Sequence, residues 1–272
     1  MDDVTRNVLI VRKSATWLVW PMLALVFVLV SCDGRAQAGA QRTAGTATTP
    51  RAAAPKDFTG YWASVVTEQW HLRMLMPPKG EYSMLPLNAQ ARAVANMWTP
   101  AQDAGNECRA YGAAAIMRVP GRLHIHWADD NTLQIDTDSG TQTRQLHFEG
   151  NSAQKPVDAQ PQWQGYSIAS WAGTPIGRGS NVPGPAGDMR VVTTQMKAGY
   201  LRKNGVPYSE KATLEEYFDT FTEPDNTSWL VVTSIITDPQ YLTGPYTYTG
   251  HFKKIPDGQG WDPTSCRADQ VR

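Results

Sequence analysis

The chain has 272 residues, of which 25 are Lys or Arg and 25 are Asp or Glu. Because no long run of one charge sign appears and a nucleic-acid-binding protein normally has a basic face, nucleic acid is excluded as the expected partner. Ten Trp and ten Tyr are many for this length. Aromatic residues favour strands and large contact surfaces, so they indicate either a β core or the wall of a pocket for an apolar ligand.

The N-terminal segment has the pattern of an export signal. Arg6, Arg12 and Lys13 precede an uncharged apolar run, residues 17–30. This run is shorter than the ~20 residues that a membrane span requires. It therefore fits the apolar core of a signal peptide, with the basic residues on its cytoplasmic side.

Two cleavage signals follow the apolar run. The first, Leu29-Val30-Ser31-Cys32, resembles the bacterial lipobox, in which the cysteine becomes the new N-terminus and carries acyl chains. The second, Ala36-Gln37-Ala38, suits ordinary signal peptidase. We expect residues 1–32 to be a signal peptide with a lipobox. A Cys32 lipid anchor would then hold the exported protein on the periplasmic face of a bacterial membrane. The alternative is a soluble periplasmic protein.

Residues 33–57 are rich in Ala, Thr, Gly and Pro and contain no large apolar side chain. Without apolar surface to bury, such a segment does not gain enough free energy to order. We expect a disordered tether here and a single domain over residues 58–272. In that domain an exported compartment permits one disulfide, between Cys108 and Cys266.

Short apolar runs separated by turn signals predict a mostly β domain. We expect a long first strand over 58–69 and one helix over 88–98, which Asn88 can cap. A meander follows, with strands at 113–119, 122–128, 132–137 and 141–148, the first two joined by a Pro-Gly turn. Further strands are expected at 163–171, 189–197, 213–222, 228–237 and 246–254, and Asn204-Gly205 predicts a tight turn.

The segment Phe58-Thr59-Gly60-Tyr61-Trp62 contains a Gly-x-Trp pattern that resembles the opening strand of lipocalins. The resemblance implies that the antiparallel meander closes into a β-barrel, here of about 8–10 strands with one short helix. It also implies that Trp62 closes one barrel end under a basic residue of the last strand, Lys253 or Lys254. The chain departs from that pattern by its length and by insertions at 77–112 and 149–187. A closed barrel of this size can hold a small ligand.

Charged residues in the meander are the first functional candidates. Arg118 shares the predicted core face with Leu123 and Ile125, and Asp136 and Arg144 lie in adjacent strands. If these side chains point inward, they form a buried charged cluster, and buried charges must be paired. The cluster is either an Arg–Asp pair that fixes strand register or a site for a carboxylate or oxyanion.

Three further residues could perform acid–base chemistry. His124 and His126 point to one face of their strand, beside Met117 and Ala115 across the predicted turn. They are either a half-exposed strand face or half of a metal site, which would need His147, Asp136 or Glu68 as a third ligand. Since no Cys pair or His-Glu-x-x-His spacing supports such a site, we expect no metal and no cofactor. Glu68 is either a general base with a raised pKa or a solvated strand end.

The sequence thus supports three functional hypotheses. The first is a lipid-anchored barrel that binds a small apolar or aromatic molecule, with Arg118 and Arg144 fixing a polar group. Its cavity would be lined by aromatic residues: Trp62, Trp70, Trp127 and Tyr166. The second is a cofactor-independent lyase, isomerase or hydrolase that uses Glu68, Arg118, His124 and Asp136 as catalytic residues. The third is a structural envelope lipoprotein.

Overall fold

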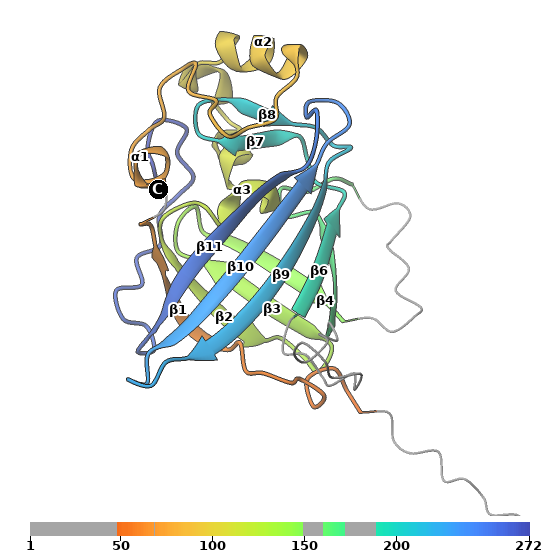
Figure 1. The fold of residues 1–272 in the computed structure, drawn as a ribbon, viewed down its shortest axis with the longest axis vertical. Coiled ribbons are helices and arrows are strands. Elements are labelled where there is room, and N and C mark those ends of the chain that lie inside the picture. Colours follow the sequence, from red (N-terminus) through yellow and green to blue (C-terminus); the bar gives the residue numbers. More distant parts are fainter. Residues whose placement is uncertain (1–47, 68, 149–159, 172–188) are drawn as a thin grey trace, which may run out of the picture. The chain divides into compact units, whose positions relative to one another are not determined.

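The computed structural model describes residues 48–67, 69–148, 160–171 and 189–272 (Figure 1). The chain divides into two units, Met1–Gly45 and Thr46–Arg272, and the second contains the described strands and helices. The predicted signal peptide, Cys32, the tether up to residue 47 and Glu68 all lie outside the described residues.

Nine strands form a closed barrel, in agreement with the predicted mostly β fold (Figure 1). Their order around the barrel is β1-β11-β10-β9-β6-β5-β4-β3-β2, and β1 pairs with both β11 and β2. The strands are β1 (Gly60–Val65), β2 (Arg122–Trp127), β3 (Thr132–Thr137), β4 (Gln142–His147), β5 (Tyr166–Trp171), β6 (Met189–Thr194), β9 (Thr213–Thr222), β10 (Ser228–Thr237) and β11 (Tyr246–Ile255).

One pair of neighbouring strands, β4 and β5, is parallel, and the other pairs in the barrel are antiparallel. An odd number of strands cannot alternate in direction all the way around a closed ring, so a nine-stranded barrel needs a parallel pair. The barrel is therefore mixed, whereas the sequence predicted an antiparallel meander throughout.

Alternate side chains of each strand point into the barrel, as the period of two requires. In β2, Leu123 and Ile125 are buried, while His124 and His126 on the opposite face are half-buried. This pattern places apolar side chains inside and polar ones outside on most strands.

A cap covers one end of the barrel (Figure 1). It contains α1 (Trp70–Arg73), α2 (Ala89–Met97), η1 (Pro100–Asp103), η2 (Glu107–Tyr111), α3 (Ala113–Ile116), β7 (Gly199–Arg202) and β8 (Val206–Tyr208). The predicted helix over 88–98 is confirmed as α2, whose Ala91 amide donates to Asn88 Oδ1 at 2.9 Å. The predicted Asn204-Gly205 turn joins β7 to β8.

One predicted strand was wrong, and another was too long. Residues 113–119 do not form a strand, because Ala113–Ile116 is the helix α3; three consecutive Ala residues favour a helix, and short apolar runs do not distinguish the two structures. The expected first strand over 58–69 is shorter, since β1 ends at Val65 and Trp70 begins α1.

The predicted Cys108–Cys266 disulfide is confirmed, with an S–S distance of 2.07 Å and a Cα–Cα distance of 5.1 Å. It joins η2 in the cap to the C-terminal segment after β11. Figure 1 shows the C-terminus close to α1. The disulfide therefore holds the last residues of the chain against the cap.

The last residues of the predicted tether, 48–57, contact the barrel. The Arg51 amide donates to the carbonyl of Asp130, the Trp171 indole donates to the carbonyl of Pro50, and Lys56 pairs with Asp219. The predicted disordered tether is therefore wrong for residues 48–57, whereas residues 33–47 lie outside the described residues. None of the helices in the described part of the chain has the length and apolar character needed to cross a bilayer.

Candidate functional site

The barrel interior is filled by side chains of its inward faces. These residues are inaccessible to solvent or nearly so, and they include Leu123, Ile125, Leu133, Ile135, Leu146, Met189, Val191, Leu214, Phe218, Leu230, Val232, Ile236 and Phe252. Within the cap, α3 lies against the barrel interior, where Tyr248 Oη donates to the carbonyl of Ala114 at 3.5 Å. Two adjoining pockets lie at the capped end of the barrel.

Arg144 points into the interior, as the cluster hypothesis required, but it pairs with Glu216 and not with Asp136. Arg144 Nη2 lies 2.6 Å from Glu216 Oε2, and Ser234 Oγ donates to Glu216 Oε1 at 3.3 Å. Sequence reasoning missed Glu216, although it falls between the inward residues Leu214 and Phe218. The pair crosses from β4 to β9 and has a structural role.

The opposite end of the barrel is closed by aromatic side chains. Trp62 is 1% exposed and donates from Nε1 to the carbonyl of Phe58 at 3.0 Å. Lys254 Nζ lies 5.3 Å from the centre of the Trp62 ring, as the resemblance to lipocalins implied. Trp127 packs nearby against Trp171, with ring centres 6.3 Å apart. Trp62 belongs to the buried core, and Trp127 and Trp171 are partly buried and pack against it.

Two of the proposed wall residues lie outside the barrel. Trp70 is 57% exposed on α1. Tyr166 lies on the outer face of β5, where its ring stacks on His147 at 4.9 Å between centres. Neither Trp70 nor Tyr166 faces the barrel interior. The structure therefore does not bring the four predicted aromatic residues into one cavity.

Arg118 lies under the cap, in the turn that follows α3. It is 8% exposed. Its guanidinium carbon lies 5.2 Å from the centre of the Tyr248 ring, and Nη2 donates to Gln69 Oε1 at 3.1 Å. The contact with Tyr248 is a cation–π interaction, which favours a charged guanidinium in a desolvated place.

Two adjoining pockets share Arg73 and Arg118, and together we call them the cap pocket. The first part has a volume of only about 30 Å³, and its apolar walls include Leu72, Val119 and Leu201. The second part, between α1 and β11, has a volume of about 280 Å³. A cavity of about 150 Å³ is enough to hold benzene, so the second part has room for a small aromatic molecule.

Four cations line the first part of the cap pocket: Arg73, Arg118, Arg202 and Lys203. Each is 4–8% exposed. In the described part of the chain, no carboxylate lies within ion-pair distance of Arg118, Arg202 or Lys203. Buried charges without a counter-ion, as at Arg118, Arg202 and Lys203, are costly, because burial removes their hydration.

Backbone carbonyl groups accept hydrogen bonds from three of these cations, and a neutral acceptor does not cancel a positive charge. Arg73 Nε donates to the carbonyl of Arg118 at 3.0 Å, and Arg202 Nη2 donates to the carbonyl of Ser83 at 2.9 Å. Lys203 Nζ donates to the carbonyl of Gln270 at 2.8 Å. Arg202 Nε and Nη1 are buried and have no hydrogen-bond partner among the described residues. The cap pocket thus retains both positive charge and unused donors.

Burial shifts the pKa of two of the four cations. It lowers the pKa of Lys203 to about 7. Burial also lowers the pKa of Arg202, and the positive charge of Arg118 acts in the same direction. Perturbed pKa values of groups that share a pocket are typical of functional sites.

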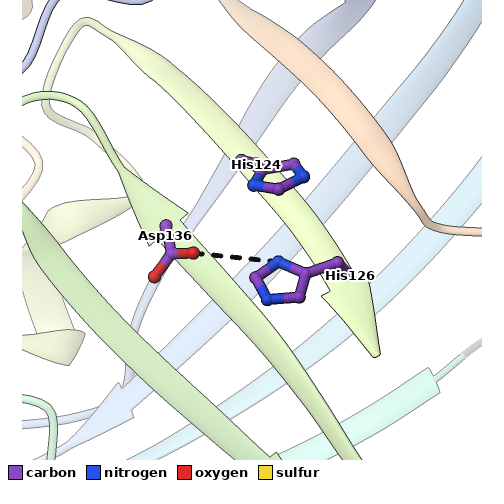
Figure 2. Close-up of side chains that lie close together, drawn as sticks. All are labelled: His124, His126 and Asp136. Carbon is purple, nitrogen blue, oxygen red and sulfur yellow. Dashed lines mark ion pairs between the residues drawn. The ribbon is translucent and has the colours of Figure 1, made fainter. Parts of the chain in front are cut away.

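His124, His126 and Asp136 lie together on the outer face of the barrel (Figure 2). His124 stacks on Tyr61 with ring centres 4.2 Å apart. Burial and the neighbouring His126 lower the pKa of His124. Asp136 therefore does not join a buried cluster with Arg118, and the histidines do not lie beside Met117 and Ala115 as the predicted hairpin required.

Searches for similar proteins found no match for this chain among protein-family models, curated proteins or solved structures. The fold is compatible with a lipocalin-like barrel, and the function has to be argued from the geometry of the chain itself.

Proposed function

We propose that this domain binds a small molecule with an apolar or aromatic body and an anionic group, and that the ligand lies in the cap pocket. The observation that supports this best is the convergence of Arg73, Arg118, Arg202 and Lys203 on one pocket with apolar walls. A ligand carboxylate, phosphate or sulfonate would supply negative charge beside Arg118, Arg202 and Lys203 and accept the unused hydrogen bonds of Arg202.

The sequence suggested a ligand inside the barrel, with Arg118 fixing its polar group. Since the interior is filled by packed side chains and by the Arg144–Glu216 pair, the proposed site moves to the capped end. Arg118 keeps its proposed role there. Arg118 is 8% exposed, and its guanidinium lies over the Tyr248 ring. Burial and this contact restrict the guanidinium to one position before a ligand binds.

The geometry favours binding over the alternative of acid–base catalysis. His124 and Asp136 lie on the outer face of the barrel, whereas Arg118 lies beneath the cap. A catalytic site requires its acid, base and charge-stabilising groups to reach one reacting centre. Among the described residues, the proposed catalytic side chains do not converge in this way.

We further propose that the protein is exported and anchored to a membrane through acylated Cys32. The basic and apolar pattern before Cys32 supports this, and the Cys108–Cys266 disulfide supports an oxidising compartment. Expression in a bacterial host should give an N-terminal peptide that begins with acylated Cys32 in mass spectra. Cys32→Ala should abolish the acylation, and an unprocessed wild-type N-terminus would contradict export.

Ligand binding is tested first by native mass spectrometry of the purified chain, which should detect a co-purified anionic molecule. Isothermal titration with a panel of aromatic carboxylates then compares the wild type with Arg118→Met. We expect at least tenfold weaker binding in the variant. Arg190→Met is the matched control, because Arg190 is half-exposed on the outer face and pairs with Glu215. Equal affinities in all three proteins would contradict the proposal.

A further inference from the structure

Two histidines and one aspartate meet on the outer face of β2 and β3 (Figure 2). His124 and His126 are two residues apart on β2, so both rings point to the same side of the sheet. Asp136 on β3 is the direct partner of His124 in the strand register. One ligand atom from each of the three side chains lies within 4.8 Å of the other two.

The Asp136 carboxylate is held in position by neutral donors. Gln134 Nε2 donates to both of its oxygens, at 3.0 and 3.1 Å, and Thr143 Oγ1 donates to Oδ1 at 2.6 Å. These donors orient the carboxylate but leave its negative charge available. Such outer contacts are what aspartate ligands of metal ions typically have.

His126 is oriented toward the same point. Its Nδ1 lies 3.7 Å from Asp136 Oδ2, beyond normal hydrogen-bond distance. This nitrogen is buried and has no hydrogen-bond partner among the described residues. A half-exposed pair at this distance contributes little to stability, so stabilisation of the fold does not explain the arrangement.

We propose that His124, His126 and Asp136 bind one divalent cation of the Zn²⁺ class. Two imidazole nitrogens and one carboxylate oxygen are ligands that suit zinc and its neighbours in the transition series. Three protein ligands leave at least one coordination position open on the solvent side. The Tyr61 ring stacked on His124 packs against one face of that imidazole.

The geometry requires only local movement to accept the ion. In a tetrahedral zinc site the ligand atoms lie roughly 3.3 Å apart, given Zn–N and Zn–O distances of about 2.0–2.2 Å. The present separations reach 4.8 Å. The side chains of His126 and Asp136 are 36% and 23% exposed, so they can turn without disturbing the core. The antiparallel pairing of β2 and β3 keeps the backbone fixed while these side chains turn.

The test uses the full chain without a polyhistidine tag, purified in a non-ionic detergent, treated with a chelator and dialysed. Titration calorimetry with Zn²⁺ should give one equivalent bound by the wild type. Asp136→Asn and His124→Gln should each weaken the binding at least tenfold. His147→Gln is the matched control, because His147 also lies on the outer face but outside the cluster, and it should bind like the wild type.

Two results would overturn the proposal: the absence of stoichiometric Zn²⁺ binding to the wild type, or binding that Asp136→Asn leaves unchanged. Circular dichroism of each variant checks that the barrel is retained, since the three residues lie outside the core. A second readout uses Co²⁺, whose visible absorption reports the ligand geometry. Gln134→Leu should reduce the affinity about 10–100-fold by releasing the carboxylate. An unchanged Co²⁺ spectrum and affinity in Gln134→Leu would contradict the role given to these donors.

Discussion

Arg144 and Glu216 form a bidentate ion pair inside the barrel, with neither side chain exposed to solvent. Removing one partner of such a pair leaves an uncompensated buried charge. We therefore expect Arg144→Met to lower the free energy of unfolding by about 3–5 kcal/mol, measured by urea denaturation.

The double variant Arg144→Met/Glu216→Leu is the control for that measurement. Because it removes both charges and keeps the volume filled, its stability should return to within about 2 kcal/mol of the wild type. A double variant as unstable as the single one would show that the pair contributes more than mutual neutralisation.

The disulfide stabilises the attachment of the C-terminal segment. Cys108 and Cys266 are 158 residues apart, and closing so long a loop contributes at most about 5 kcal/mol by the chain-entropy model. Cys108→Ser/Cys266→Ser should lower the melting temperature, measured by circular dichroism. A reductant should lower the melting temperature of the wild type and leave that of the double variant unchanged. If the reductant lowered both melting temperatures equally, the disulfide would not have this role.

Stability should depend on pH through Lys203. Its pKa is about 7 in the folded protein and about 10.4 in an unfolded chain. Between these values the unfolded chain binds more protons, so this residue makes the free energy of unfolding rise with pH from about 7 to 10. Below pH 7 the full cost of burying the charge remains.

Lys203→Met removes that titration. Compared with the wild type by urea denaturation at several pH values, the variant should have its largest stability advantage below pH 7. This advantage should shrink as the pH rises toward 10. An advantage that is constant with pH would show that Lys203 has an ordinary pKa in the folded state.

The β7–β8 hairpin carries Arg202 and Lys203 into the cap pocket, and Gly205 shapes its turn. Gly205 has a φ of +79°, and a Cβ there would lie 2.1 Å from Trp98 Cγ. Gly258 has a similar φ of +71° with nothing within 4 Å. Gly258→Ala should cost only the roughly 1–2 kcal/mol of backbone strain.

Gly205→Ala should cost about 1–3 kcal/mol more than Gly258→Ala, because the added methyl group meets Trp98. Thermal melts compare the two variants. If Gly205→Ala and Gly258→Ala lose the same stability, Trp98 moves aside freely and does not hold the hairpin turn in place.

Much of the barrel could be predicted from alternating patterns in single strands. In β2 to β4 the inward residues are apolar apart from Arg144 and Thr137, and the turns between them are polar, so the register follows from the sequence. The Asn88 cap and the cysteine count likewise determined α2 and the disulfide. The sequence could not distinguish a strand from a helix over residues 113–116, since a short apolar run fits both.

The candidate site was predictable only in part. Arg118 stood out because it lies in an apolar run, and Arg144 because a strand face was expected to be buried. The cap pocket also needs Arg73, Arg202 and Lys203, which are far from Arg118 in sequence and meet it only through the packing of α1 and β7. Nothing local to those residues marks them as neighbours.

The central claim is that positive charge in the cap pocket recognises a negative charge on the ligand. The most direct test titrates a matched aromatic pair, phenylacetate and phenylacetamide, against the wild type and Arg118→Met. The wild type should prefer the carboxylate at least tenfold, and Arg118→Met should lose most of that preference. A preference that is absent in the wild type, or unchanged in the variant, would contradict the account.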